Sequence, residues 1–163
     1  MQKILMIHDV CEELFELPLH EYTLTFDDGL ISQYQYIDRI SQINTKKIFF
    51  ITTGYVGAQK YMDLEQLRHI LSIPNCELGG HSHNHTDITQ FINASTQVRH
   101  IQDDTRQMLE WFRMNLGIRP MKYCFPFNKE FSVLHRVTLR PFGFTEFYGR
   151  ERIPVETLLH SSC

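Results

Sequence analysis

Short apolar runs alternate with amphipathic segments along most of the chain. Continuous apolar runs or period-two alternation are typical of strands, and they occupy residues 4–7, 22–26, 46–52, 76–80, 121–125, 142–147 and 152–155. Apolar positions three or four residues apart predict helices, at residues 31–43, 64–71, 95–116 and 132–140. This alternation predicts an α/β fold with a mainly parallel sheet, either open or closed into a barrel. No linker-like segment interrupts it, so we expect a single domain over residues 1–163.

Two of the expected helix ends carry typical capping residues. Asp63 directly precedes the helix at 64–71, and a short acidic side chain there can accept a backbone N–H of the first turn. Gly117 follows the long helix, where glycine commonly ends a helix in a left-handed conformation. Both boundaries are therefore predicted from local chemistry as well as from periodicity.

Charge and hydropathy exclude some classes of function. A net charge of −3 with 42% hydrophobic residues is typical of a globular protein and provides no basic face, so we exclude nucleic acid as a partner. No segment reaches the roughly 20 apolar residues that span a bilayer. The first residues lack the long apolar core of a signal peptide, so we expect a cytoplasmic location.

The four cysteines are Cys11, Cys76, Cys124 and Cys163. They are scattered and form no Cys-x-x-Cys pair, which matches neither a zinc finger nor a disulfide framework. We therefore expect free thiols and a reducing compartment.

Adjacent carboxylates, Asp27 and Asp28, end the strand expected at 22–26, and Gly29 follows them. Like charges at this distance repel and raise each other's pKa, a cost that a bound cation relieves. One carboxylate would then bind the cation while the other acts as a base, and Gly29 would permit a sharp turn. The alternative interpretation is a solvated Asp-Asp-Gly turn.

Three of the nine histidines lie within residues 81–85, directly after a strand expected to end at Gly80. If this segment forms a helical turn, His81 and His85 project from one face at i, i+4 spacing and can chelate one cation. His83 would point elsewhere. Two imidazoles and a carboxylate form a three-ligand set that suits zinc, with cobalt, nickel and manganese as alternatives. The competing interpretation is a histidine-rich surface loop.

The sequence TFDDG at residues 25–29, followed by HSHNH at 81–85, resembles the first two motifs of the NodB-like polysaccharide deacetylases (carbohydrate esterase family four). The strand at 47–50 also resembles the family strand between them. The resemblance covers most of the chain. It implies a distorted, incomplete (β/α) barrel and hydrolysis of N-acetyl groups on amino sugars.

The resemblance also implies site roles. Asp28, His81 and His85 would hold the divalent metal, and Asp27 would be the general base. The chemistry is consistent with these roles, because a divalent cation polarises a carbonyl and lowers the pKa of bound water. A nearby carboxylate can take the proton of that water as it attacks.

The third family motif, Arg-x-Pro-Phe/Tyr, is only partly present. The matching residues 124–127 read CFPF, so Cys124 stands where the family has an arginine that orients the base. We interpret Cys124 as a small buried residue rather than a catalytic thiol. Pro126 and Phe127 match, and together with Tyr123 they are expected to contact substrate.

The resemblance implies that a histidine is the proton donor for the leaving amine. Residues 158–160, LLH, have the pattern of the fifth family motif, which would make His160 the general acid. His8, at the end of the first strand, is a second candidate.

Two functions from different classes follow. The first is a metal-dependent carbohydrate N-deacetylase acting on an N-acetylated sugar or glycan precursor. The second is a catalytically impaired, metal-containing glycan-binding domain. Amide hydrolysis on a non-sugar substrate is a third reading, because the metal chemistry does not depend on the rest of the molecule.

Overall fold

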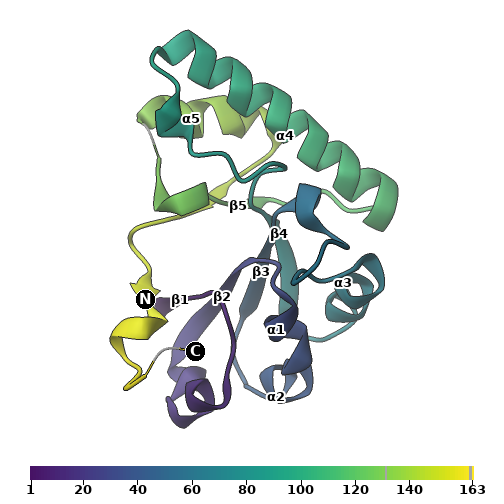
Figure 1. The fold of residues 1–163 in the computed structure, drawn as a ribbon, viewed down its shortest axis with the longest axis vertical. Helices are drawn as coiled ribbons and strands as arrows, with labels where there is room; N and C mark the ends of the chain where they lie inside the picture. Colours follow the sequence, from purple (N-terminus) through teal and green to yellow (C-terminus); the bar gives the residue numbers. More distant parts are fainter. Residues whose placement is uncertain (131, 162) are drawn as a thin grey trace. The chain divides into compact units, whose positions relative to one another are not determined.

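Seven strands form the sheet of the computed structural model, which describes residues 1–130, 132–161 and 163. The strands are β1 (Lys3–Ile7), β2 (Tyr22–Asp28), β3 (Lys47–Ile51), β4 (Cys76–Gly80), β5 (Lys122–Cys124), β6 (Glu146–Tyr148) and β7 (Ile153–Pro154). Their order is β6-β5-β4-β3-β2-β1-β7 (Figure 1). The pairings β1–β2, β1–β7, β4–β5 and β5–β6 are all parallel, as the sequence predicted.

The chain divides into two compact units. The first contains Met1–Phe50, Val56–Leu78 and Glu151–Cys163, and the second contains Ile51–Tyr55 and Gly79–Arg150. β3 and β4 begin in the first unit and end in the second. Each unit is described separately below.

The core of the first unit forms around β1, β2 and β3. All five residues of β3 are buried, and Phe49 stacks on Phe26 of β2 with ring centroids 4.6 Å apart. A strand buried on both faces reads as a continuous apolar run, which is why the sequence pattern predicted it. Lys47 at its start is also buried, and its Nζ donates to the carbonyl of Thr45 at 2.9 Å.

The helices of the first unit are α1 (Ile31–Gln35), α2 (Ile37–Ser41) and α3 (Leu64–Leu71). α3 has the predicted N-cap, because the Asp63 carboxylate accepts the backbone N–H of Gln66 at 2.9 Å. The prediction of one helix over 31–43 was wrong. Tyr36 leaves helical geometry with ψ of 16°, and its ring packs on Phe15, 5.6 Å away.

A disulfide joins Cys11 to Cys163 in the first unit. The expectation of four free thiols was therefore wrong for this pair, while Cys76 and Cys124 remain thiols. The bond links residues 152 positions apart, so no local spacing could have revealed it.

The second unit is built on the long helix α4 (Ala94–Leu116), which packs with α5 (Val133–Leu139) (Figure 1). The Asn93 side chain caps α4 by accepting the N–H of Thr96 at 2.8 Å. Gly117 ends it with φ of 64°, as predicted. Short 3-10 turns complete the chain at Glu12–Glu16, Leu19–Glu21, Thr53–Tyr55, Ile88–Gln90, Pro126–Asn128, Arg140–Phe142 and Val155–Thr157.

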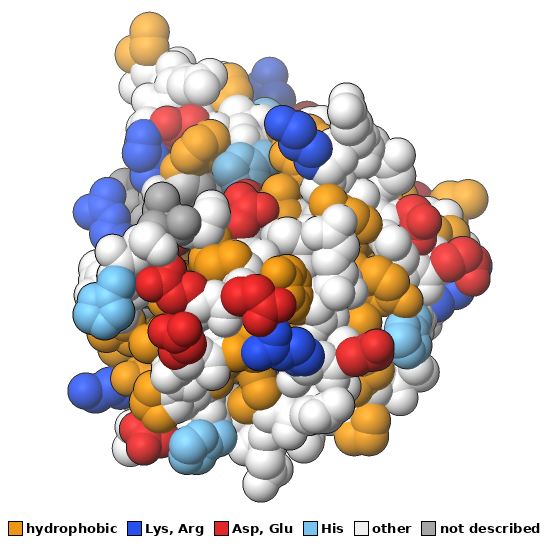
Figure 2. Space-filling model, turned by 60° about the horizontal axis from the view of Figure 1, so that its bottom comes forward, with side chains coloured by type: hydrophobic (Ala, Val, Ile, Leu, Met, Phe, Trp, Pro, Cys, Tyr) orange, Lys and Arg blue, Asp and Glu red, His pale blue; other side chains and the backbone are white. Residues whose placement is uncertain are grey.

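The surface charge is mixed on the face drawn in Figure 2, where acidic, basic and apolar side chains are interspersed. Within the described part of the chain, none of the helices combines the length and apolar character that crossing a bilayer requires.

Candidate functional site

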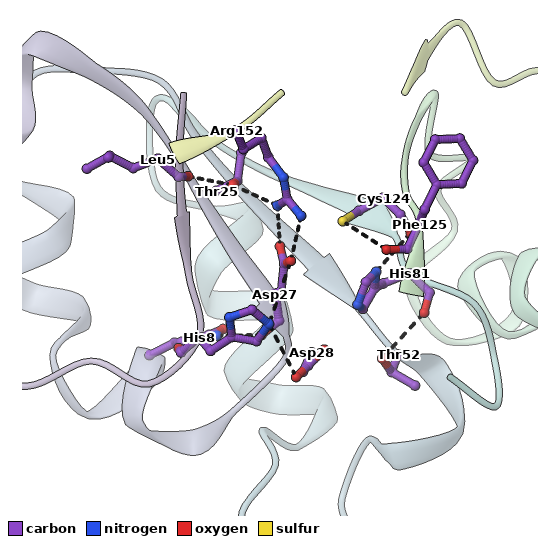
Figure 3. Close-up of polar contacts among 11 residues, drawn as sticks. Leu5, His8, Thr25, Asp27, Asp28, Thr52, His81, Cys124, Phe125 and Arg152 are labelled. Atoms are coloured by element: carbon purple, nitrogen blue, oxygen red, sulfur yellow. Dashed lines mark hydrogen bonds and ion pairs between the residues drawn. The ribbon is translucent and has the colours of Figure 1, made fainter. Parts of the chain in front are cut away.

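A buried ion pair fixes Asp27 at the end of β2. Arg152 Nη1 donates to Asp27 Oδ1 at 2.7 Å, and its Nη2 donates to Oδ2 at 2.9 Å (Figure 3). The two side chains are 0% and 3% exposed. Arg152 directly precedes β7, and the pairing of β7 with β1 brings its guanidinium to Asp27. Two parallel N–H···O bonds define the carboxylate plane as well as its position.

Thr25, two residues before Asp27 on β2, also binds the Arg152 guanidinium. Its Oγ1 donates to the carbonyl of Leu5 at 2.6 Å and accepts from Arg152 Nη1 at 3.0 Å. The guanidinium is thus anchored to two residues of the same strand. Buried charges are retained in proteins only when they are paired and hydrogen-bonded, and this pair meets both conditions.

Asp28 turns the chain sharply after the pair. Its φ is 80°, and Gly29 follows with φ of 82°. A left-handed conformation is strained for a residue other than glycine, and such strain is commonly found at functional sites. Asp28 is partly exposed while Asp27 is buried, so the two adjacent carboxylates have different surroundings.

His8, at the end of β1, faces both carboxylates. Its Nε2 lies 3.9 Å from Asp27 Oδ2 and 3.9 Å from Asp28 Oδ2 (Figure 3). Buried Gln33 holds the strand ends together, because its Nε2 donates to the carbonyl of His8 at 2.9 Å and to that of Asp27 at 2.8 Å. The His8 side chain is 38% exposed, so it can reach a bound molecule.

In the second unit, His81 follows β4 and is held by the backbone. Its N–H donates to the carbonyl of Ile51 at 3.1 Å, and its Nδ1 lies 2.8 Å from the carbonyl oxygen of Cys124 (Figure 3). A carbonyl only accepts, so Nδ1 carries the proton and the neutral ring has its lone pair on Nε2. A hydrogen bond of this kind commonly orients a metal-binding histidine.

The expectation of a helical turn at 81–85 was wrong. Ser82 and His85 have φ of 70° and 52°, and the N–H of His85 donates to Ser82 Oγ at 3.0 Å. The resulting loop still places the rings of His81 and His85 4.8 Å apart, in a T-shaped arrangement. His83 points to Thr53 instead, with Nδ1 2.8 Å from Thr53 Oγ1.

The segment after β5 contributes an exposed aromatic ring. Phe127 is 55% exposed with φ of 58°, and its ring lies 4.6 Å from that of His85. Pro126 beside it is buried. Tyr123 is buried against Phe144, and burial is the main cause that raises the pKa of its hydroxyl, followed by the charge of Asp104.

Comparison with known proteins identifies the family of the chain. Residues 17–145 match the family model described as "Polysaccharide deacetylase". The chain belongs to the polysaccharide deacetylase family. A search of curated proteins found no match.

Solved structures of deacetylases resemble this chain. IcaB from Ammonifex degensii has a TM-score of 0.76 at 17% identity, over 95% of this chain and 92% of that chain. The BpsB deacetylase domain from Bordetella bronchiseptica has a TM-score of 0.73 at 14% identity, over 91% and 88%. This likeness confirms the predicted fold, a distorted, incomplete (β/α) barrel of the NodB-like type. The family match supports deacetylase activity in general.

A third similar structure is a mutant of BA3943, described as a CE4 family pseudoenzyme with restored enzymatic activity. It has a TM-score of 0.60 at 16% identity, over 90% of this chain and 44% of that chain. Membership of this fold therefore does not by itself establish that a given chain is active.

Arg152 is the residue that sequence reasoning missed. Cys124, at the position where the resemblance led us to expect an arginine, is fully buried, and its carbonyl orients His81. In this member of the family a guanidinium reaches Asp27 from a distant part of the sequence. The sequence offered no local signal, because it placed Arg152 at the start of an expected edge strand without indicating what its side chain contacts.

The predicted general acid has little structural support. His160 is exposed, and among the residues that the structure describes it makes no hydrogen bond or ion pair. His8 in contrast lies beside both carboxylates of β2.

Proposed function

We propose that this chain is a metal-dependent hydrolase that removes an N-acetyl group from an amino sugar of a glycan or glycan precursor. The observation that carries the proposal is the buried Arg152–Asp27 pair beside Asp28. An oriented carboxylate next to a second one of different exposure is suited to separate the roles of base and metal ligand. The family match supports the reaction class.

We further propose that Asp28, His81 and His85 hold the metal, with zinc as the expected ion and cobalt, nickel or manganese as alternatives. The donor set is one that first-row divalent ions prefer. The tautomer of His81 is suitable, because its Nδ1–H is engaged with Cys124. When bound, the ion would polarise the acetamide carbonyl and lower the pKa of a water ligand.

In the proposed reaction, Asp27 accepts a proton from the water whose oxygen attacks the acetyl carbon. The C–N bond then breaks, acetate leaves, and the sugar nitrogen takes up a proton to become a free amine. Arg152 keeps Asp27 in one orientation throughout, which saves reorganisation at the moment of proton transfer. We propose His8 as the donor to the amine, ahead of His160, because it lies beside Asp27 and is partly exposed.

Phe127 and Pro126 remain the proposed substrate contacts. The exposed ring of Phe127, next to His85, offers an apolar face on which a sugar ring can pack. Tyr123 is buried and is better suited to support the segment of Pro126 and Phe127. We therefore leave it out of the proposed substrate contacts.

The test is acetate release from N-acetylglucosamine oligosaccharides by zinc-loaded protein. We expect Asp27→Asn to lower the rate by about 10²–10⁴-fold, the usual contribution of a general base. Asp38→Asn, at an exposed position of α2, is the matched control and should behave as wild type. Equal rates for wild type and Asp27→Asn would refute the assigned role.

The second candidate is a catalytically impaired glycan-binding domain. It is favoured by the similar structure described as a pseudoenzyme and by Cys124 in the place of the family arginine. Metal and oligosaccharide binding without acetate release from any N-acetylated sugar would favour this candidate over the enzyme.

The cytoplasmic location stays a prediction. One of its two supports, the expectation of free thiols, does not hold for Cys11 and Cys163, and disulfides persist mainly in oxidising compartments.

A further inference from the structure

A buried carboxylate lies in the middle of α4, a helix to which no role in the proposed chemistry has been assigned. Asp104 is 4% exposed. Its neighbour Asp103 is exposed and pairs with Arg106 at 3.2 Å, as acidic residues on a helix surface commonly do. Ionised carboxylates are costly to bury without partners, so the partners of Asp104 indicate its role.

Among the described residues, the carboxylate of Asp104 accepts hydrogen bonds only from the loop of residues 81–85, called the histidine loop below. Its Oδ2 accepts the N–H of His83 at 2.9 Å. Its Oδ1 accepts the N–H of Asn84 at 3.0 Å and the Asn84 side-chain amide at 3.3 Å. The carboxylate therefore binds the two residues at the centre of the segment between His81 and His85.

These two amides need an external acceptor because the loop is neither helix nor strand. Ser82 and His85, on either side of them, have φ of 70° and 52°. Left-handed residues of this kind persist only where their surroundings hold them. Asp104 satisfies both N–H groups with one ionised side chain, and hydrogen bonds to a charged acceptor are about twice as strong as neutral ones.

The same loop is anchored from its other side by neutral groups. The N–H of Gly54 donates to the carbonyl of His83 at 2.8 Å, and Thr53 Oγ1 lies 2.8 Å from His83 Nδ1. A side chain at position 54 would meet the His83 carbonyl oxygen at 2.3 Å, so glycine is needed for this close approach. The loop is thus held between residues 53–54 and the carboxylate of α4.

We propose that Asp104 is a positioning residue that holds the loop of His81 and His85 in its metal-binding conformation and thereby sets the affinity for the ion. This inference rests on the proposed metal site and adds a residue outside the two family motifs. Without the carboxylate, part of the free energy of metal binding would be used to order the loop. Residues that orient metal ligands typically change affinity by about 10–100-fold when they are replaced.

The test is calorimetric titration of Zn²⁺ or Co²⁺ into chelator-treated wild type, Asp104→Asn and Asp103→Asn. Asparagine keeps the shape of Asp104, but it has one acceptor oxygen and turns an NH₂ group toward a loop amide. We expect Asp104→Asn to bind about 10–100-fold more weakly, with a shifted visible spectrum of bound Co²⁺. Asp103→Asn, the same change one residue away on the exposed side, should bind as wild type.

A third variant separates positioning from loss of fold. Asp104→Glu keeps the charged acceptor, so it should retain more affinity than Asp104→Asn. If Asp104→Asn is folded and binds as tightly as wild type, or if Asp104→Glu binds as weakly as Asp104→Asn, the inference is overturned while the metal site stands. If wild type binds no ion, the proposed metal site fails, and the inference fails with it.

Discussion

Replacing Arg152 by glutamine tests whether its ion pair holds the base. The charge centres of a bidentate pair lie about 4 Å apart, and at an effective dielectric constant of 20 their attraction is about 4 kcal/mol. Both side chains are buried, so Arg152→Gln leaves Asp27 as an uncompensated charge. Breaking such a pair from one side costs about 3–5 kcal/mol, a large share of a typical stability of about 5–15 kcal/mol.

The assay is urea unfolding of wild type, Arg152→Gln and Arg150→Gln, followed by acetate release from each folded variant. Arg150 is exposed, so its replacement should change the free energy of unfolding by less than about 0.5 kcal/mol. We expect Arg152→Gln to lose about 3–5 kcal/mol and most of its activity. Arg152→Lys should recover stability better than activity, because lysine restores the charge without the two parallel hydrogen bonds.

A double variant sharpens the same prediction. In Asp27→Asn with Arg152→Gln the buried charge is absent, so the double variant should be more stable than the sum of the two single effects predicts. Additive effects, or an Arg152→Gln variant as stable and active as Arg150→Gln, would refute the reasoning.

Three further predictions follow from other contacts. His8→Gln should lower acetate release by about 10²–10⁴-fold and His160→Gln should leave it near the wild-type rate; the reverse pattern would restore His160 as the acid. Burial, with a smaller effect of the Arg136 charge, lowers the pKa of His135 from 6.5 to about 4. Because the unfolded chain then binds the proton more readily, the free energy of unfolding should fall by up to about 3 kcal/mol as the pH drops from about 6.5 to about 4. Urea unfolding at several pH values in this range should show a weaker pH dependence of this free energy in His135→Gln than in wild type. An equal pH dependence in the two proteins would contradict the assignment. Reducing the Cys11–Cys163 disulfide, which closes a loop of 152 residues, should cost about 5 kcal/mol on the chain-entropy account; unfolding with and without reductant measures this, and an unchanged midpoint would count against the bond.

The sequence was informative where local chemistry decides the structure. β3 was predicted because its buried run is continuous, and α3 because Asp63 caps it. Asp27 and Asp28 were expected at a strand end, and β2 extends to Asp28. Each of these rests on neighbours within a few residues along the chain.

The features that the sequence did not predict depend on contacts between residues far apart in the chain. Arg152 and Asp27 are 125 positions apart, and only the pairing of β7 with β1 selects Arg152 over Arg150. The conformation of the histidine loop was missed for the same reason, since its amides are satisfied by Asp104, 20 or more positions further on. The i, i+4 spacing of His81 and His85 predicted neighbouring imidazoles. Their rings do lie 4.8 Å apart, but in a loop with left-handed residues rather than in a helical turn.

The most direct test of the account is a metal titration of activity. Chelator-treated protein receives increasing Zn²⁺ or Co²⁺, and acetate release from an N-acetylglucosamine oligosaccharide is measured at each step. We predict that release rises from background to a plateau at about one equivalent of metal, as expected for a single catalytic site, and that Asp28→Asn shows no rise at these concentrations. Release that is unaffected by chelator, or saturation with bound metal without any release, would contradict the central claim.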